Sequence, residues 1–384
     1  MIKKSYEEIN SKIKNGTAVV LTAEEIISMV EEQGIAATTR KVDVVTTGTF
    51  GAMCSSGAFI NLGHSNPPIK MSKIRLNDVP ASGGLAAVDT YIGATEVSDS
   101  DENYGGAHVI EDLVAGKNIR LQASSYGTDC YPRKAIDTLI TKDSINECFL
   151  FNPRNAYQNY SAAANSTDNI LYTYMGTLLP KFGNVTYSTA GQLSPLLNDP
   201  YLRTIGLGTR IFLAGTEGYV AWNGTQFNPS KPRNEKGVPL GAAATLSLVG
   251  NLKNMSTDYL KAAVFKNYGV SLFVGIGIPI PLLDEEITQF TAVRDQDIQT
   301  SVYDYGVPDR SRPALKTVSY AELKSGMIEL NGKKVRTAPM SSLYKARAIA
   351  NQLKSWIQKG SFLLTEPVAP LPSEANILSL DERR

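Results

Sequence analysis

Residues 5–34 read SYEEINSKIKNGTAVVLTAEEIISMVEEQG and contain the pattern that decides the fold class. Apolar side chains recur at helical spacing from Tyr6 to Ile13, behind a Ser-x-x-Glu capping box that predicts where the helix starts. An apolar run at 18–21 predicts a strand, and a second capping box at Thr22 opens another helix. The order helix, strand, helix predicts an α/β fold, with a mixed α+β fold as the alternative.

The second half of the chain carries apolar runs that predict buried strands or short helices separated by Gly and Pro. Residues 152–200 are instead rich in Asn, Tyr, Ser, Thr and Gly, which is typical of a loop-rich insertion or the start of a second lobe. We therefore expect residues 1–370 to form a single large domain or two closely packed lobes, with the lobe boundary near 150–200. Residues 371–384 are predicted to be a flexible C-terminal tail.

Two further stretches predict helices. Apolar side chains from Leu343 to Ile357 form one face of a long helix, which Gly360 ends. Pro132 suits the first turn of a helix, where its missing N–H has no cost, and Ile136 begins the apolar side that this helix would bury.

The charge balance excludes several classes of partner. The chain has 38 basic and 37 acidic side chains, a net charge of +1, and no long run of like charges. It therefore offers no electrostatic surface for nucleic acid or an anionic membrane. No stretch of about 18 apolar residues could span a bilayer, and the first ten residues lack the apolar core of a signal peptide. These features predict a cytoplasmic protein whose three cysteines are not a disulfide framework.

Cofactor and metal motifs are missing. The segment Gly275-Ile276-Gly277 lacks the third glycine of a dinucleotide fingerprint, and no Walker A pattern occurs. No CxxC or HExxH motif is present, so we predict no metal and no tightly bound cofactor. His64 and His108 are the only histidines, and both lie beside glycine-rich segments. Each is a candidate catalytic acid or base, with a hydrogen-bonded structural role as the alternative.

The three cysteines have different surroundings. Cys148 is flanked by apolar residues and is predicted to be buried and inert. Cys54 and Cys130 lie in polar loops that follow predicted strands, where α/β proteins place ligands. Cys130 would also lie at the start of the helix that Pro132 opens, whose free N–H groups would lower the pKa of its thiol. Spacing alone leaves open whether the two thiols share one site.

Polar residues beside these two cysteines are candidates for binding a substrate. The basic side chains near Cys130 could bind a carboxylate, with a role as surface charges as the alternative. The candidates are Arg133, Lys134, Ser55, Ser56 and Thr128.

Long stretches of the chain resemble one family. The segments GTFGAMCSSGAFINLGHSNPPIK and YGTDCYPRK, together with further matches up to about Pro372, are similar to the homocysteine biosynthesis enzyme, sulfur-incorporation family. The resemblance implies conversion of aspartate semialdehyde to homocysteine, with sulfide as the sulfur source and a ferredoxin-type iron–sulfur protein as the external reductant. The family's two functional cysteines fall on Cys54 and Cys130. Many relatives carry regulatory CBS modules, and no CBS or ferredoxin module is expected here.

The chemistry suggests a mechanism and two rivals. We hypothesise that one thiol carries the sulfur as a persulfide and that the other cleaves the S–S bond, which leaves a Cys54–Cys130 disulfide for the partner to reduce. One rival is a cysteine-dependent acyl transferase or hydrolase with a histidine base. The other is a non-catalytic persulfide carrier, or a scaffold for an iron–sulfur partner. A homo-oligomer is compatible with all three.

Overall fold

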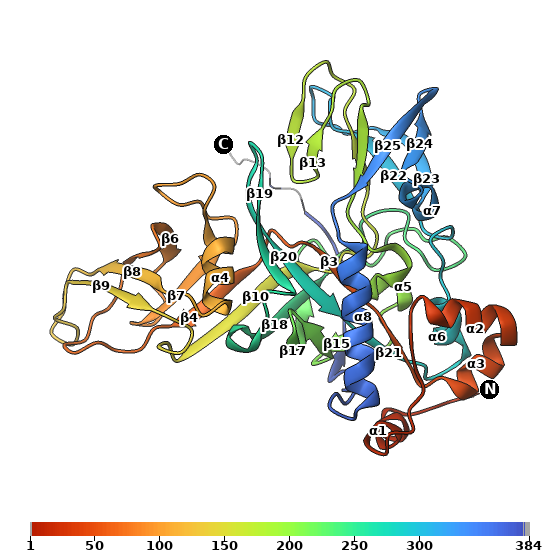
Figure 1. The fold of residues 1–384 in the computed structure, drawn as a ribbon, viewed down its shortest axis with the longest axis horizontal. Coiled ribbons are helices and arrows are strands. Elements are labelled where there is room, and N and C mark those ends of the chain that lie inside the picture. The colour runs from red at the N-terminus through yellow and green to blue at the C-terminus, as the bar shows by residue number, and fades with distance from the viewer. Residues whose placement is uncertain (1, 379, 381–384) are drawn as a thin grey trace.

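The centre of the molecule is a large antiparallel sheet. A computed structural model describes residues 2–378 and 380, and Figure 1 shows the large sheet extending to one end of the molecule at β8 and β9. Thirteen strands form it in the order β19-β20-β16-β17-β18-β10-β4-β7-β6-β5-β8-β9, and β3 pairs with β20. These strands are β3 (Thr49–Ala52), β4 (Gly57–Asn61), β5 (Lys73–Leu76), β6 (Val79–Ser82), β7 (Asp89–Gly93), β8 (Ile119–Ser124), β9 (Ala135–Ile140), β10 (Glu147–Asn155), β16 (Arg210–Leu213), β17 (Thr216–Asn223), β18 (Leu246–Asn251), β19 (Leu260–Phe265) and β20 (Gly269–Gly277).

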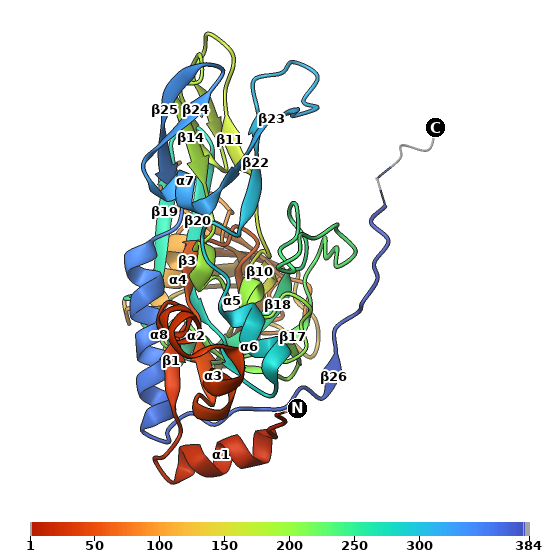
Figure 2. The same cartoon turned by 90° about the vertical axis from the view of Figure 1, so that its right-hand side faces the viewer.

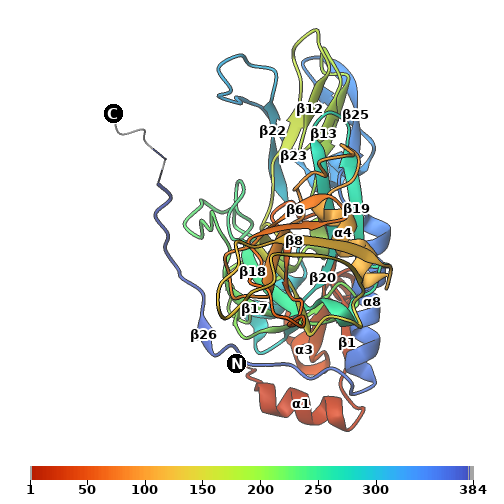
Figure 3. The same ribbon diagram turned by 90° about the vertical axis from the view of Figure 1, so that its left-hand side faces the viewer.

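A second sheet of six strands has the order β23-β22-β11-β14-β25-β24 and stands at the opposite end of the molecule from α1 (Figures 2 and 3). Its β11–β22 and β14–β25 pairings are parallel. Its strands are β11 (Ala162–Ala164), β14 (Asn184–Tyr187), β22 (Gln299–Asp304), β23 (Ala314–Ser319), β24 (Met327–Leu330) and β25 (Lys333–Pro339). The smaller groups are β1 (Val20–Thr22) with β2 (Val44–Thr46) and β21 (Pro279–Pro281), β12 (Leu171–Thr173) with β13 (Gly176–Leu178), and β15 (Gly206–Leu207) with β26 (Ala369–Pro370).

The helices lie around these sheets. They are α1 (Tyr6–Lys14), α2 (Glu25–Gln33), α3 (Ile35–Lys41), α4 (Gly106–Val114), α5 (Pro195–Asn198), α6 (Glu285–Thr291), α7 (Tyr320–Lys324) and α8 (Leu343–Gln358), with 3-10 turns at Gly191–Leu193 and Leu252–Asn254. The longest, α8, packs against β20 and β3. A Cβ on Gly277 would lie 2.9 Å from Ile349 of α8, so this glycine admits the helix side chain rather than a nucleotide phosphate.

Several predictions of secondary structure are confirmed. The fold is a mixture of helices and strands, with α1, β1 and α2 in the predicted order. Both predicted caps accept from the backbone, Ser5 from the Glu8 N–H and Thr22 from the Glu25 N–H. The box is reciprocal at Thr22, whose N–H donates to Glu25 Oε2, whereas the hydrogen bonds of the described residues include no return bond from Ser5 to Glu8. The predicted long helix near the C-terminus is α8, with a buried face of Ala346, Ile349, Ala350, Leu353 and Ile357.

Two predictions of local structure are wrong. The helix predicted from Pro132 is the strand β9, whose Ile136 and Leu139 pair with β8 instead of lying on one helix face. Four residues of β9 are exposed, so the apolar spacing that suggested a helix does not mark a buried face. The polar loop predicted around Cys54 is only the short turn between β3 and β4, because these short Gly- and Ser-rich strands lack the strong alternation that would have predicted them.

The chain passes from the large sheet to the six-stranded sheet between β10 and β11 and returns to the large sheet at β16. The lobe boundary near 150–200 stays a prediction. Of the predicted tail, residues 379 and 381–384 lie outside the described residues. Leu371 is buried and 372–378 are exposed.

Candidate active site

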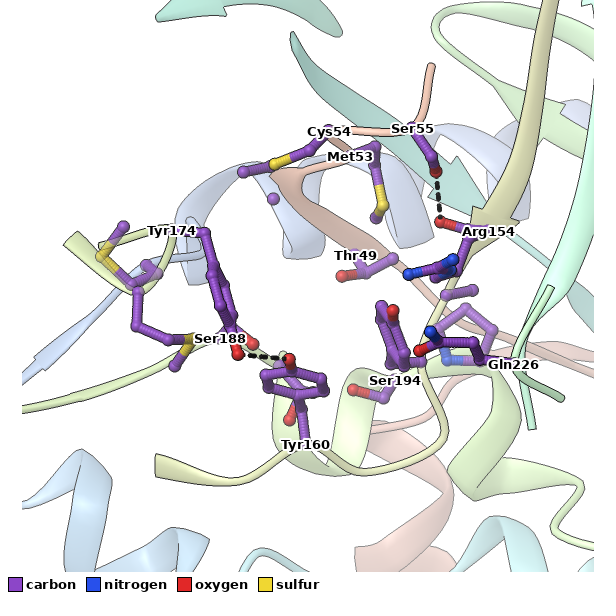
Figure 4. A pocket seen from close by; sticks show the side chains of 18 of the residues that line it. Thr49, Met53, Cys54, Ser55, Arg154, Tyr160, Tyr174, Ser188, Ser194 and Gln226 are labelled. Atoms are coloured by element: carbon purple, nitrogen blue, oxygen red, sulfur yellow. Dashed lines mark hydrogen bonds between the residues drawn. The ribbon is translucent and has the colours of Figure 1, made fainter. Parts of the chain in front are cut away.

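A cavity of about 340 Å³ lies between the two sheets and is open to solvent on one side. This volume accommodates an amino-acid-sized molecule. Figure 4 shows side chains from distant parts of the sequence pointing toward the space between Cys54 and Tyr160. The lining residues are Thr49, Gly51, Ala52, Met53, Cys54, Ser55, Arg154, Ala156, Tyr157, Tyr160, Tyr174, Met175, Ser188, Thr189, Ser194, Pro195, Gln226, Tyr268 and Met340.

Cys54 lies in the turn where the chain changes its pairing partner. β3 pairs with β20, whereas β4 pairs with β10 and β7. The Met53 N–H donates to Leu272 O, and the Ser56 N–H closes the turn on Met53 O at 3.0 Å. The turn therefore holds Cys54 half-buried at the cavity, where Ser271 Oγ donates a hydrogen bond to its Sγ at 3.1 Å.

The two serines after Cys54 anchor its turn to β10. Ser55 Oγ contacts Asn152 Oδ1 at 2.8 Å and Arg154 O at 3.2 Å. Asn152 Nδ2 donates to Ser56 Oγ at 2.5 Å, and Ser56 is buried. Both serines were predicted to bind substrate. In the structure Ser55 lines the cavity, Ser56 does not, and both hydroxyls are engaged in holding the turn.

Tyrosines form much of the remaining wall. Burial raises the pKa of Tyr268, and negative charge on Cys54 raises it further. Burial also raises the pKa of Tyr157, with Arg154 opposing and Cys54 adding to the rise. Both hydroxyls therefore stay protonated at neutral pH beside the thiol, where each can donate a hydrogen bond.

A second group of tyrosines closes the far side of the cavity. Tyr160 donates to Tyr174 Oη at 3.2 Å, and Tyr174 and Tyr305 hydroxyls lie 2.8 Å apart. Arg312 also donates to Tyr174 Oη at 3.0 Å. This network attaches the turn of the β12–β13 hairpin to the six-stranded sheet and fixes the wall opposite Cys54 (Figure 4).

Two buried hydroxyls that line the cavity, those of Ser194 and Thr189, have no hydrogen-bond partner among the described residues. Ser194 is only 3% exposed and lines the cavity, yet its Oγ has no hydrogen-bond partner among the described residues. A buried hydroxyl without a partner is costly, which indicates that a bound molecule supplies one.

Cys130 lies at a different place from Cys54. It is exposed in the 125–134 loop between β8 and β9, not at a helix N-terminus, because a strand follows. The His64 ring stacks on Tyr131 at 6.1 Å, which places this loop beside the chain that leaves the far end of β4. Cys54 comes just before Gly57, the residue that begins β4, and so lies at the other end of this strand. The five residues of β4 separate the two ends by roughly 13 Å, whereas a disulfide needs Cα atoms within about 7 Å.

The other predicted residues near Cys130 share its loop and do not line the cavity. Thr128 Oγ1 accepts from the Tyr131 N–H, and the Arg133 N–H donates to Pro68 O. The Arg133 side chain donates to Ala135 O, and Lys134 is exposed. The structure therefore groups His64, Thr128, Cys130, Arg133 and Lys134 around one surface loop, away from Cys54.

His108 and Cys148 have structural surroundings. His108 Nδ1 accepts from the Gly105 N–H at 3.2 Å, its ring stacks on Tyr104, and burial lowers its pKa. It therefore caps α4, and it does not line the cavity. Cys148 is 1% exposed, and burial raises the pKa of its thiol to about 12, which confirms that it is buried.

Sequence reasoning missed Arg154, Ser194 and the tyrosines of the wall. All of these except Tyr268 and Tyr305 lie within residues 152–200, where the sequence showed only a composition rich in Asn, Tyr, Ser, Thr and Gly. Their composition was the one available signal, because no periodic pattern relates residues that meet only through the packing of two sheets.

None of the described helices is long and apolar enough to cross a bilayer. Within the same residues, no group of three or more His, Cys, Asp and Glu side chains is placed to hold a metal ion.

A half-buried thiol, protonated tyrosines and an amino-acid-sized cavity define a cysteine-bearing small-molecule site. The model of the homocysteine biosynthesis enzyme, sulfur-incorporation family matches residues 18–364, and the chain belongs to this family. The family predicted from the sequence is thereby confirmed.

Curated relatives are similar along almost the whole chain. The L-aspartate semialdehyde sulfurtransferase of Methanosarcina acetivorans is 56% identical over 383 residues, covering 100% of this chain and 75% of that protein. The protein of the same name from Methanocaldococcus jannaschii is 53% identical, covering 98% and 75%. An uncharacterized protein of Methanothermobacter thermautotrophicus is 30% identical, covering 85% and 73%. No solved structure matches the chain.

Proposed function

We propose that the protein is an enzyme that transfers sulfur to L-aspartate semialdehyde and forms L-homocysteine in the cavity at Cys54. The observation that carries the proposal is the Cys54 thiol, which accepts from Ser271 at the wall of an amino-acid-sized cavity. Two relatives with more than half of their aligned residues identical carry the name of this activity.

The reaction requires a sulfur nucleophile, loss of the aldehyde oxygen as water, and reduction. Per turnover, one aldehyde, one H₂S, two electrons and two protons give one thiol and one water. Cys54 carries the sulfur as a persulfide whose outer sulfur adds to the aldehyde carbon. Charging Cys54 with sulfide releases two electrons, which the oxidised form of the ferredoxin-type partner accepts. Reducing the sulfur-bearing carbon and cleaving the S–S bond then take two electrons each, so the net demand is two. An external ferredoxin-type iron–sulfur protein supplies these two electrons. The enzyme works with this partner in the cytoplasm.

Loss of the oxygen as water needs a proton donor. The sequence suggested His64 or His108, but neither lines the cavity. Tyr157 and Tyr268 line it, and both have a raised pKa, with burial as the main cause and the charge of Cys54 contributing. We assign the proton donation to one of these tyrosines.

The cavity supports sulfur transfer over acyl transfer. A cysteine-dependent acyl transferase or hydrolase needs a base beside its thiol, which the sequence could supply only as histidine. The neighbours of Cys54 here are a serine hydroxyl and protonated tyrosines, and these suit addition to an aldehyde and loss of water.

The Ser194 hydroxyl binds a polar group of the substrate. We expect Ser194→Ala to raise KM for aspartate semialdehyde about 3- to 10-fold, the effect of one hydrogen bond. The thermal midpoint should not fall, because the buried hydroxyl loses no partner within the described residues. Steady-state kinetics and calorimetry on the same preparation check both. A fall in the midpoint with unchanged KM would contradict the assignment.

Cys130 acts at the surface, where it can exchange with a partner's thiol or with a second copy of the chain. We expect mild oxidation with diamide to give covalent dimers through Cys130 and no Cys54–Cys130 bridge within one chain, since β4 separates the two thiols. Non-reducing gels and peptide mass mapping test this, with Cys130→Ala as the variant and Cys148→Ala as the control. A Cys54–Cys130 peptide pair from the monomer band would restore the disulfide mechanism hypothesised from the sequence.

The test of the proposed function is anaerobic assay of homocysteine from aspartate semialdehyde and sulfide with a strong reductant, and then with a reduced ferredoxin-type protein. We expect product from the unaltered chain. Absence of homocysteine under both conditions would overturn the proposal. Sulfur loading of Cys54 without turnover would then favour the persulfide-carrier alternative.

A further inference from the structure

We infer that Arg154 binds the α-carboxylate of the substrate and thereby directs its aldehyde toward Cys54. This inference rests on the proposed function, because it concerns the same cavity. The wall of the cavity is almost entirely uncharged. Of the described residues that line the cavity, Arg154 alone carries a formal charge at neutral pH, apart from the thiol when it ionises.

The guanidinium of Arg154 is held in place but has no acidic partner. Its Nε donates to Thr225 Oγ1 at 2.9 Å, and the Tyr157 hydroxyl contacts the same side chain. None of the ion pairs among the described residues involves Arg154. Figure 4 shows the guanidinium pointing into the cavity. Its two terminal nitrogens are therefore placed to donate to a carboxylate in the bidentate geometry that arginine favours.

Arg154 and Cys54 belong to one hydrogen-bonded frame. Ser55, the next residue after Cys54, reaches Arg154 O at 3.2 Å and Asn152 Oδ1 at 2.8 Å. The Arg154 N–H also donates to Asn152 Oδ1, at 2.9 Å. The thiol and the guanidinium therefore project into the same cavity from backbones that are tied together. This arrangement fixes their relative position, as orientation of a small substrate requires.

The substrate has the complementary pattern of groups. Aspartate semialdehyde has its aldehyde carbon three bonds from the carboxylate carbon, so one end can meet Cys54 while the other meets Arg154. Its ammonium group needs an uncharged acceptor, since the lining has no carboxylate, and the Ser194 hydroxyl is available. The Arg154 guanidinium is thus matched to the substrate carboxylate. We therefore expect the cavity to prefer aldehydes that carry an α-amino acid group over simple aldehydes.

The experiment removes the charge from either side of the contact. Turnover of aspartate semialdehyde is compared with turnover of 3-aminopropanal, which is the same molecule without its carboxylate, in the unaltered chain, Arg154→Gln and Arg154→Lys. We expect Arg154→Gln to lower kcat/KM for aspartate semialdehyde about 10- to 100-fold and to leave 3-aminopropanal within about twofold. Arg154→Lys should recover part of the loss. Arg75→Gln, on an exposed pair with Asp99, controls for loss of a positive charge.

Binding of unreactive analogues tests the role of Arg154 without any turnover. Calorimetry with L-homoserine and with 3-amino-1-propanol compares the same two groups without chemistry. The unaltered chain should bind homoserine about 10- to 100-fold more tightly than Arg154→Gln, with no such difference for the amino alcohol. Homoserine affinity that is undetectable in the unaltered chain or equal in both proteins, or an equal loss of turnover for both aldehydes, would overturn the role of Arg154. Arginine-dependent binding without homocysteine formation would keep that role and reject the proposed function instead.

Discussion

We expect Cys54→Ala to abolish homocysteine formation, with a fall in rate of at least about 1,000-fold, because no other described thiol lines the cavity. Cys148→Ala should stay within about twofold, because that thiol is buried in the core and burial raises its pKa to about 12. Anaerobic turnover with saturating sulfide and reductant provides the measurement.

The effect of Cys54→Ala must be distinguished from loss of fold. Cys54→Ser keeps the size of the side chain and its contact with Ser271. We expect both variants to have unchanged thermal midpoints and no turnover. Mass spectrometry after exposure to sulfane sulfur should find the added 32 Da on Cys54 in the unaltered chain and on neither variant at that position. A turnover of more than a few per cent in Cys54→Ala would reject Cys54 as the sulfur carrier.

The second large effect concerns stability. Gly48 immediately precedes β3 and lies under α8, where an added Cβ would collide with the carbonyl oxygen of Ala346. That oxygen belongs to a helix backbone and cannot turn aside, so α8 must move away from the sheet. We expect Gly48→Ala to lower the free energy of unfolding by about 3 kcal/mol. Urea unfolding followed by circular dichroism measures the change.

Gly241→Ala is the matched control, since its Cβ would meet no atom within 4 Å. It should change the free energy of unfolding by less than about 0.5 kcal/mol. Equal stability of both variants would show that α8 does not sit on Gly48 as closely as described. Since β3 leads directly to Cys54, Gly48→Ala should also lower activity, and it should do so at temperatures below its unfolding transition.

The sequence predicted features that depend on neighbouring residues. The Ser5 cap, the Thr22 capping box and the apolar face of α8 are local patterns, and the structure contains each of them. The prediction failed at β9, where the apolar spacing of Ile136 and Leu139 suggested a helix. There the pairing with β8, a long-range interaction, determines the backbone.

The same distinction applies to the candidate site. The polar turn at Cys54 was identified from its composition and from the family resemblance, and the structure places it at the cavity. The basic residue proposed to bind the substrate was sought next to a cysteine in sequence, at Arg133 and Lys134. Arg154 shares a cavity with Cys54 because β4 and β10 pair and Ser55 bonds to Arg154 O, a contact between residues about a hundred positions apart that no local pattern encodes.

The cavity wall draws on residues from Thr49 to Met340, taken in turn from both sheets and from the hairpin between them. Consequently the complete wall forms only after Met340 has been synthesised and both sheets have folded. A persulfide is a reactive species that oxidises and exchanges readily in the open. Because both sheets and the hairpin contribute to the wall, the cavity encloses the Cys54 thiol only when these three parts of the fold have come together.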